Sequence, residues 1–72
     1  MKNRKPFFAE AHTEKRSFST LSEAVDWVNR ILADSGYTGI EAETNGEFVE
    51  FRAVKDGRSW DAAIIEDLSF DD

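Results

Sequence analysis

The chain has 72 residues, a formal net charge of −6, one histidine and no cysteine. This length suits one small domain, and the absence of cysteine from the sequence excludes a disulfide scaffold and a thiolate metal site. The longest apolar run, residues 62–65, is far shorter than the roughly 20 residues of a membrane span, so we expect a soluble cytoplasmic protein.

The charge is divided unevenly along the chain. Residues 1–16 hold five basic and two acidic side chains (+3), whereas residues 17–72 hold four basic and thirteen acidic ones (−9), which together give −6. We therefore expect one domain with a flexible basic leader at residues 1–5 and an acidic tail at residues 67–72. An acidic domain repels phosphate, which disfavours general nucleic-acid binding.

The first regular element predicted is a strand over residues 7–12. Its alternation places Phe7, Ala9 and Ala11 on the more apolar of two faces. After a turn at Thr13-Glu14, residues 15–19 are a candidate for a short returning strand.

A helix is predicted from about Leu21 to Asp34 or Ser35. Thr20 and Glu23 have the spacing of a capping box, and Gly36 stands where a left-handed residue commonly ends a helix. Trp27 falls on the flank of the apolar stripe, where the sheet edge or a partner would cover half of its indole. The apolar stripe, with the period of a helix buried on one side, consists of Leu21, Ala24, Val25, Val28, Ile31 and Leu32.

Two hairpins are predicted after the helix. Asn45-Gly46 and Asp56-Gly57 are favoured pairs for two-residue type I′ turns. Counting outward from these turns gives one apolar face with the predicted pairs Ala42–Val49, Ile40–Phe51, Thr38–Ala53, Ala53–Trp60, Phe51–Ala62 and Val49–Ile64. The same count gives an opposite face with the predicted pairs Arg52–Asp61, Glu41–Glu50 and Phe48–Ile65.

These elements predict an α+β fold, a two-layer sandwich in which one helix packs on an antiparallel sheet of four or five strands. The element order is strand, candidate strand, helix and three further strands. The face of the sheet away from the helix is then the main surface left for function. Its candidate protein-binding residues are Glu41, Glu43, Phe48, Glu50, Arg52, Asp61 and Ile65.

No catalytic constellation is found in the sequence. His12 is the lone conventional base, and the four glycines do not have the spacing of a phosphate-binding loop. The carboxylates on the sheet face lack the deep cleft that glycoside hydrolysis requires and the spacing of a calcium loop. We therefore predict no enzymatic activity, no metal and no cofactor.

The acidic face instead predicts a protein-interaction module whose partner has a basic surface. Carboxylates two residues apart on a strand are roughly 6.8 Å apart, similar to successive phosphates along a nucleic-acid strand. In size and charge the chain is similar to phage-encoded anti-restriction and anti-CRISPR inhibitors. A small inhibitor or regulator of a nucleic-acid-binding protein is therefore the concrete form we expect.

Two alternatives remain open at this point. One is a small nucleic-acid-binding domain that uses the basic leader with Lys55 and Arg58 at a hairpin tip. The other is a structural subunit that buries Phe48 and Ile65 in a homodimer, since oligomerisation commonly supports small domains.

A short segment carries a local resemblance. Residues 17–27 contain Phe18, Thr20, Glu23, Ala24 and Trp27 in the spacing Phe-x-Thr-x-x-Glu-Ala-x-x-Trp. This spacing resembles a strand-to-helix junction in small DNA-binding domains of phage integrases. Those domains are basic and place their strands before the helix, and capping and core packing account for each residue here, so the resemblance does not imply DNA binding.

Overall fold

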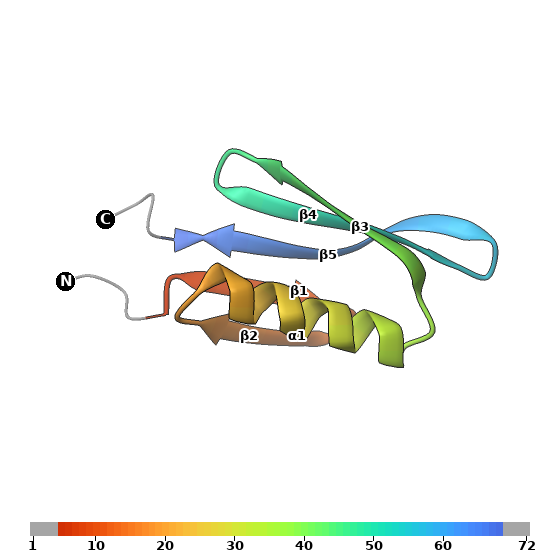
Figure 1. Ribbon diagram of the computed structural model, residues 1–72, viewed down its shortest axis with the longest axis horizontal. Coiled ribbons are helices and arrows are strands. Elements are labelled where there is room, and N and C mark those ends of the chain that lie inside the picture. The colour runs from red at the N-terminus through yellow and green to blue at the C-terminus, as the bar shows by residue number, and fades with distance from the viewer. Residues whose placement is uncertain (1–4, 69–72) are drawn as a thin grey trace.

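Five antiparallel strands and one helix form two layers in the computed structural model, which describes residues 5–68 (Figure 1). The strand order is β2-β1-β5-β4-β3, so the predicted α+β sandwich is confirmed, with five strands. No helix in this described part of the chain is long and apolar enough to cross a membrane. The elements are β1 (Phe7–Ala11), β2 (Glu14–Phe18), α1 (Leu21–Asp34), β3 (Thr38–Asn45), β4 (Phe48–Lys55) and β5 (Arg58–Asp67).

The candidate returning strand is present as β2, which pairs with β1 in an antiparallel hairpin. The turn lies at His12-Thr13, one residue earlier than predicted, because Ala11 and Glu14 close the hairpin and His12 takes a positive φ of 58°. Ala9 and Ala11 are fully buried, as their place on the apolar face of the strand predicts.

The helix has the predicted bounds and the predicted caps. Thr20 Oγ1 accepts a hydrogen bond from the Glu23 backbone N–H at 3.2 Å and donates one to Glu23 Oε1 at 3.0 Å. At the other end, the Gly36 N–H bonds to the Ala33 carbonyl and the Tyr37 N–H to the Leu32 carbonyl. This pattern is a Schellman motif, and it requires the left-handed φ of 90° that Gly36 adopts.

The predicted apolar stripe of α1 faces the sheet, with Val25 and Ile31 half-buried at its sides. Ala24, Val28 and Leu32 are fully buried, but Leu21 is 39% exposed and lines an open hollow beside the β3–β4 turn. Trp27 is half-buried, and its ring centroid lies 5.5 Å from that of Phe18 on the edge strand β2. The prediction that the sheet edge covers one side of this indole is confirmed.

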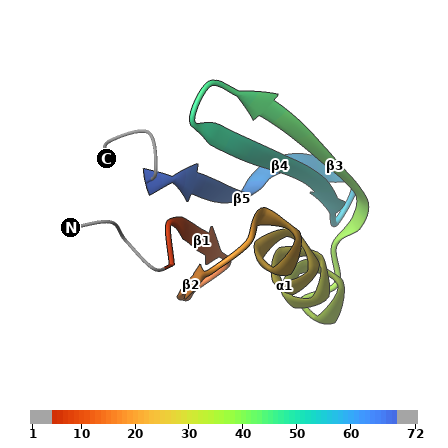
Figure 2. The same ribbon diagram turned by 60° about the vertical axis from the view of Figure 1, so that its left-hand side comes forward.

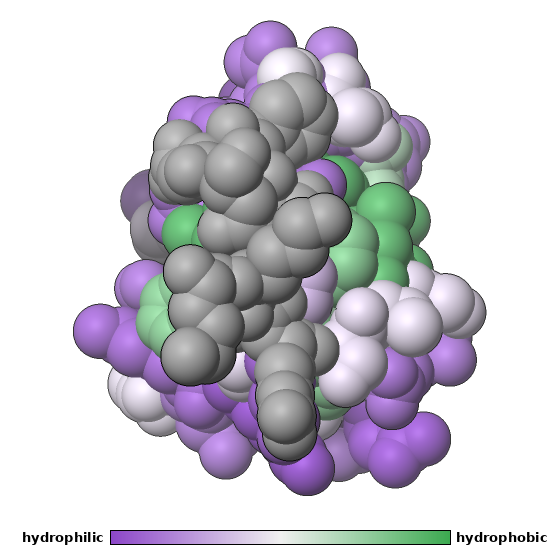
Figure 3. Space-filling view, turned by 90° about the vertical axis from the view of Figure 1, so that its left-hand side faces the viewer, coloured by the Kyte–Doolittle hydropathy of each residue, from purple (hydrophilic) through white to green (hydrophobic). Residues whose placement is uncertain are grey.

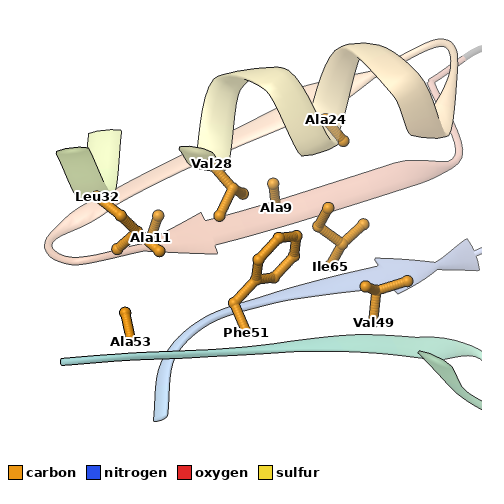
Figure 4. Close-up of a cluster of buried hydrophobic side chains, with 9 residues drawn as sticks. All are labelled: Ala9, Ala11, Ala24, Val28, Leu32, Val49, Phe51, Ala53 and Ile65. Atoms are coloured by element: carbon orange, nitrogen blue, oxygen red, sulfur yellow. The ribbon is translucent and has the colours of Figure 1, made fainter. Parts of the chain in front are cut away.

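The core lies between α1 and the middle of the sheet. Side chains from the helix point down toward Ala9 and Ala11 of β1 and meet Phe51 and Ile65 rising from β4 and β5 (Figure 4). Packing of this kind, with small residues on the strand beneath the helix, lets the two layers approach closely. The buried residues are Ala9, Ala11, Ala24, Val28, Leu32, Val49, Phe51, Ala53 and Ile65.

The β3–β4 hairpin is shifted from the predicted register. Asn45 pairs with Phe48, so the turn residues are Gly46 and Glu47, and Gly46 has the positive φ (63°) that a type II′ turn places first. From Glu41 to Asn45 the predicted partners are therefore wrong by two residues, which keeps these side chains on their predicted faces. A bulge between Thr38 and Glu41 then changes the pairing again. Thr38, predicted opposite the core residue Ala53, instead pairs with Val54 on the side away from the helix. The observed pairs are Thr38–Val54, Glu41–Arg52, Ala42–Phe51, Glu43–Glu50 and Thr44–Val49.

The β4–β5 hairpin follows the prediction only near its turn. Asp56 and Gly57 both have positive φ (55° and 76°), as a type I′ turn requires, and the pairs Ala53–Trp60 and Arg52–Asp61 are confirmed. Beyond them the register shifts at Ala62.

Because of this bulge, three of the predicted pairs are wrong. Phe51 pairs with Ala63 instead of Ala62, Val49 with Ile65 instead of Ile64, and Phe48 with Glu66 instead of Ile65. The extra residue rotates the rest of β5 by one position, since neighbouring strand residues point to opposite faces. Ile65, predicted on the outer face, is therefore a core residue that is 1% exposed.

The first and last parts of the described chain, residues 6–7 and 67–68, lie side by side. Phe7 pairs with Asp67, and the Leu68 backbone N–H donates to the Pro6 carbonyl at 2.7 Å. The start of the predicted acidic tail, residues 67–68, is thus part of the fold. Residues 1–4 of the predicted leader and residues 69–72 of the tail lie outside the described residues.

The bulge can be tested by comparing two neighbouring isoleucines. Ile65→Ala should lower the free energy of unfolding by about 2–5 kcal/mol because it leaves a cavity in the core. Ile64→Ala, on the half-buried outer side, should cost about 1 kcal/mol. Urea denaturation followed by circular dichroism measures both values.

The reverse ordering, with the larger loss at Ile64, would contradict the bulged register. If Ile65→Ala is unfolded without denaturant, Ile65→Val and Ile64→Val replace the alanine variants. Ile65→Val should then lower the free energy of unfolding by about 0.5–1.5 kcal/mol, which is more than Ile64→Val.

Candidate protein-binding face

The side of the sheet away from α1, here called the outer face, has no helix packed on it within residues 5–68 (Figure 2). Residues at alternate positions of the strands point to it, because those between them point to the helix. All five strands contribute to this face. Its side chains include Phe8, Glu10, Lys15, Ser17, Glu41, Glu43, Phe48, Glu50, Arg52, Val54, Asp61, Ile64 and Glu66.

An acidic hollow occupies the β3 side of the outer face. Its volume is about 470 Å³, and strands β3, β4 and β5 each supply carboxylates to its wall. Glu43 and Glu50 are direct cross-strand partners, an unfavourable juxtaposition of like charges. The lining residues are Glu41, Ala42, Glu43, Glu50, Arg52 and Asp61.

A second hollow of about 280 Å³ continues the first toward β1. The two hollows share Glu50 and Asp61, and the second adds Glu10 from β1 and Ile64 from β5. Glu10 lies opposite Ile64, which in turn lies opposite Glu50, so these three side chains form one row across three strands. The acidic surface therefore extends over four strands.

Arg52 stands in the middle of this acidic surface. It is the cross-strand partner of Glu41 on one side and of Asp61 on the other. Its Nε donates to Asp61 Oδ1 at 3.3 Å, but the two side chains are 70% and 89% exposed. An exposed pair of this kind contributes about 0–1 kcal/mol to stability, so both groups remain accessible to another molecule.

Apolar side chains lie at the other end of the outer face. Phe8 on β1 and Phe48 on β4 flank Glu66 of β5 in one row, and Ile64 lies in the next. All three apolar side chains are half-buried and do not pack against the core cluster. The outer face thus combines an acidic half with an apolar margin.

Five of the seven predicted binding residues line the acidic hollow together: Glu41, Glu43, Glu50, Arg52 and Asp61. Phe48 shares their face but lies toward its apolar margin. Ile65 does not lie on this face, because the bulge directs its side chain into the core. The predicted dimer surface of Phe48 with Ile65 is therefore not formed.

Sequence reasoning missed Glu10, Ile64 and Glu66 as members of this face. Glu10 joins it because β1 pairs with β5, and the other two join it because of the bulge at Ala62. The alternation of β1 did place Glu10 on the polar side of its strand, but nothing local to that strand identifies its neighbour in the sheet.

The hairpin-tip residues of the nucleic-acid-binding alternative lie away from the acidic hollow, and residues 1–4 of its basic leader lie outside the described residues. Lys55 and Arg58 close the β4–β5 turn. This turn lies at one end of the 44 Å long axis of the molecule, opposite the end where β1 begins and β5 ends (Figure 1). Lys55 Nζ is 5.1 Å from the centroid of the Tyr37 ring, and its carbonyl accepts a hydrogen bond from Trp60 Nε1 at 3.2 Å. This tip is separate from the acidic hollow.

The outer face presents charged and apolar side chains. Among residues 5–68, no group of three or more His, Cys, Asp or Glu side chains is arranged to hold a metal ion. Comparison of the chain with protein-family models, curated proteins and solved structures finds no match. A functional assignment therefore depends on the geometry of the face itself.

The exposed ion pair provides a test of this geometry. Arg52→Ala should change the free energy of unfolding by less than about 1 kcal/mol, because Arg52 and Asp61 are both solvated. The loss should shrink further in 0.5 M salt, which screens the repulsion among the remaining carboxylates. Urea denaturation at low and high salt measures this, and a loss of several kcal/mol would show that Arg52 is needed for the fold.

Proposed function

We propose that the protein is a non-enzymatic protein-binding module whose outer face binds a basic surface of a larger protein. The observation that carries this proposal is the pair of adjoining hollows lined by five carboxylates from four strands. The carboxylates are Glu10, Glu41, Glu43, Glu50 and Asp61.

Electrostatics favours such a ligand. Glu43 and Glu50 are held opposite one another by the strand register, so the free protein carries an unfavourable contact that a cation between them would relieve. Complementary potentials across an interface also accelerate association and select against partners of the wrong charge. A basic partner therefore gains in both rate and specificity.

The apolar margin supports binding to a protein. Charge alone provides specificity and speed more than affinity, whereas buried aromatic side chains commonly dominate the energy of an interface. Phe8 and Phe48 stand beside the acidic hollows and are already partly exposed. A partner with apolar residues next to its basic ones would bury both.

The concrete form we propose is an inhibitor or regulator of a nucleic-acid-binding protein. Glu41 and Glu43 are separated by two positions on β3, roughly 6.8 Å along a strand, which is similar to the spacing of successive phosphates. A surface that presents carboxylates at this spacing competes with nucleic acid for a basic groove. A phage-encoded inhibitor fits this size and charge.

Charge reversal tests the proposed face. Glu41→Lys combined with Glu50→Lys should abolish capture of partners that the tagged wild-type chain retains from its host at low salt. Both positions are exposed, so circular dichroism should show an unchanged fold. For a captured partner, titration calorimetry should show a large loss of affinity for the variant and a fall in wild-type affinity as salt rises.

The matched control reverses two exposed carboxylates on the other layer. Asp26→Lys with Asp34→Lys on α1 changes the net charge by the same amount but leaves the outer face intact. The control should bind as the wild type does. Equal losses for both double variants, or none for either, would rule out the outer face as the binding site.

A further inference from the structure

Strand β3 forms one edge of the sheet. Within residues 5–68 it pairs with β4 on one side, and each of its eight residues except Ile40 is exposed. An edge strand directs a row of backbone N–H and C=O groups away from its single neighbour, which makes it a template for pairing with another chain. β3 is therefore a candidate docking edge.

The helix contacts β3 but leaves the part of the strand after Ile40 uncovered. Ala42 and Thr44 lie opposite the core residues Phe51 and Val49, so they belong to the helix side of the sheet, yet both are exposed. Five strands spaced about 4.8 Å apart are wider than a helix about 10–12 Å across, and α1 packs mainly on β1. An incoming strand would find space on this side of the sheet.

An open apolar hollow confirms that space. Its volume is about 220 Å³, and Thr44, Val49, Leu21 and Ile65 are among its lining residues. Apolar surface is also visible among hydrophilic side chains at the end of the sheet where β1 begins and β5 ends (Figure 3). Apolar side chains of a strand placed beside β3 would lie next to Ala42 and Thr44, at the edge of this hollow.

The other side of the same strand is acidic. Glu41 and Glu43 alternate with Ala42 and Thr44 and point to the outer face, where Glu50 adds a third carboxylate. Directly opposed side chains on neighbouring strands interact, and opposite charges there are favourable. A strand beside β3 is therefore favoured when its outer-face residues are basic and its helix-side residues are apolar.

We propose that β3 binds an extended segment of a basic partner protein by strand addition, with Lys or Arg alternating with apolar residues in that segment. This inference rests on the proposed function and specifies how its partner binds. Backbone hydrogen bonds to the edge provide affinity, and the two alternating faces provide specificity.

A second copy of this chain is a poor occupant of the same edge. Antiparallel pairing of two β3 strands about Ala42 would set Glu41 of each copy against Glu43 of the other. Shifting that register by two residues sets Glu41 or Glu43 against itself. Like charges directly opposed are destabilising, so the charge pattern that suits a basic segment also opposes self-association.

The opposite edge of the sheet, β2, does not suit this partner. It has five residues, and Lys15 and Arg16 carry the same charge as the proposed segment. The Arg16 guanidinium also lies over the Phe18 ring, 5.5 Å from its centroid. Because charge distinguishes the two edges, β2 provides a matched control for β3.

The backbone pattern identifies the residues to change. Along an antiparallel strand, the backbone N–H and C=O groups of successive residues point alternately to the paired strand and away from it. Asn45 and Phe48 close a two-residue turn, so the backbone groups of Asn45, Glu43 and Glu41 bond β4. Those of Thr44 and Ala42 point to the open edge. By the same count from the Ala11–Glu14 pair, Ser17 points to the open edge of β2.

Proline at such a position removes an outward N–H and blocks the edge without disturbing the existing ladder. The test titrates wild type, Ala42→Pro and Ser17→Pro with a peptide of alternating lysine and valine, as long as β3. A second peptide has the same composition with its lysines and valines in separate blocks. Amide exchange by nuclear magnetic resonance and the dissociation constant are measured.

The alternating peptide should protect the amides of Ala42 and Thr44 in the wild type and bind more tightly than the block peptide. Ala42→Pro should weaken its binding about tenfold, and Ser17→Pro should leave it unchanged. The exchange measurement uses wild-type protein, so the proposal is tested even if Ala42→Pro fails to fold.

Three results would overturn strand addition. One is a wild type that binds neither peptide, and another is binding without protection of the two edge amides. The third is a wild-type dimer that Ala42→Pro converts to a monomer, since a second copy would then occupy the edge. If Glu41→Lys with Glu50→Lys abolishes partner binding while Ala42→Pro does not, the outer face stands as the binding surface and strand addition fails.

Discussion

The pairing of β1 with β5 is the contact on which the rest of this structure depends. It joins the N-terminal hairpin to the three-stranded meander and places Ala9 opposite Ile65 at the centre of the sheet. The helix then lies over β1, whose alanines leave room for close packing. Without this contact, the meander and the hairpin would each have an apolar side, and residues 5–68 contain one helix to cover both.

The same contact decides what the helix leaves uncovered. A single helix spans only part of a five-stranded sheet, and its position over β1 places β3 at the opposite, open margin. The exposure of Ala42 and Thr44 on the helix side is a direct consequence. The acidic outer face and the open β3 edge therefore share Glu41 and Glu43, and one partner strand can contact both.

The bulge at Ala62 connects the core with the outer face. By inserting one residue into β5, it directs Ile65 inward and brings Ile64 and Glu66 to the outer side. The inner side gains a large core residue at the point where β1 and β4 flank β5. The outer side gains the apolar margin and extends the acidic surface toward Glu10 of β1, so a single backbone irregularity shapes both layers.

The sequence by itself determined the elements with local signals: the capped helix Leu21–Asp34, the Asp56-Gly57 turn and the side of β3 and β4 on which Glu41, Glu43, Glu50 and Arg52 lie. It did not determine the register past Ala62, because Ala62-Ala63-Ile64-Ile65 has the same small-then-large pattern in either frame. It did not place β1 beside β5 either, since strand neighbours distant in sequence are chosen by packing across the whole core. Only the tertiary structure decided these points, and with them which carboxylates share a hollow and which sheet edge stays open.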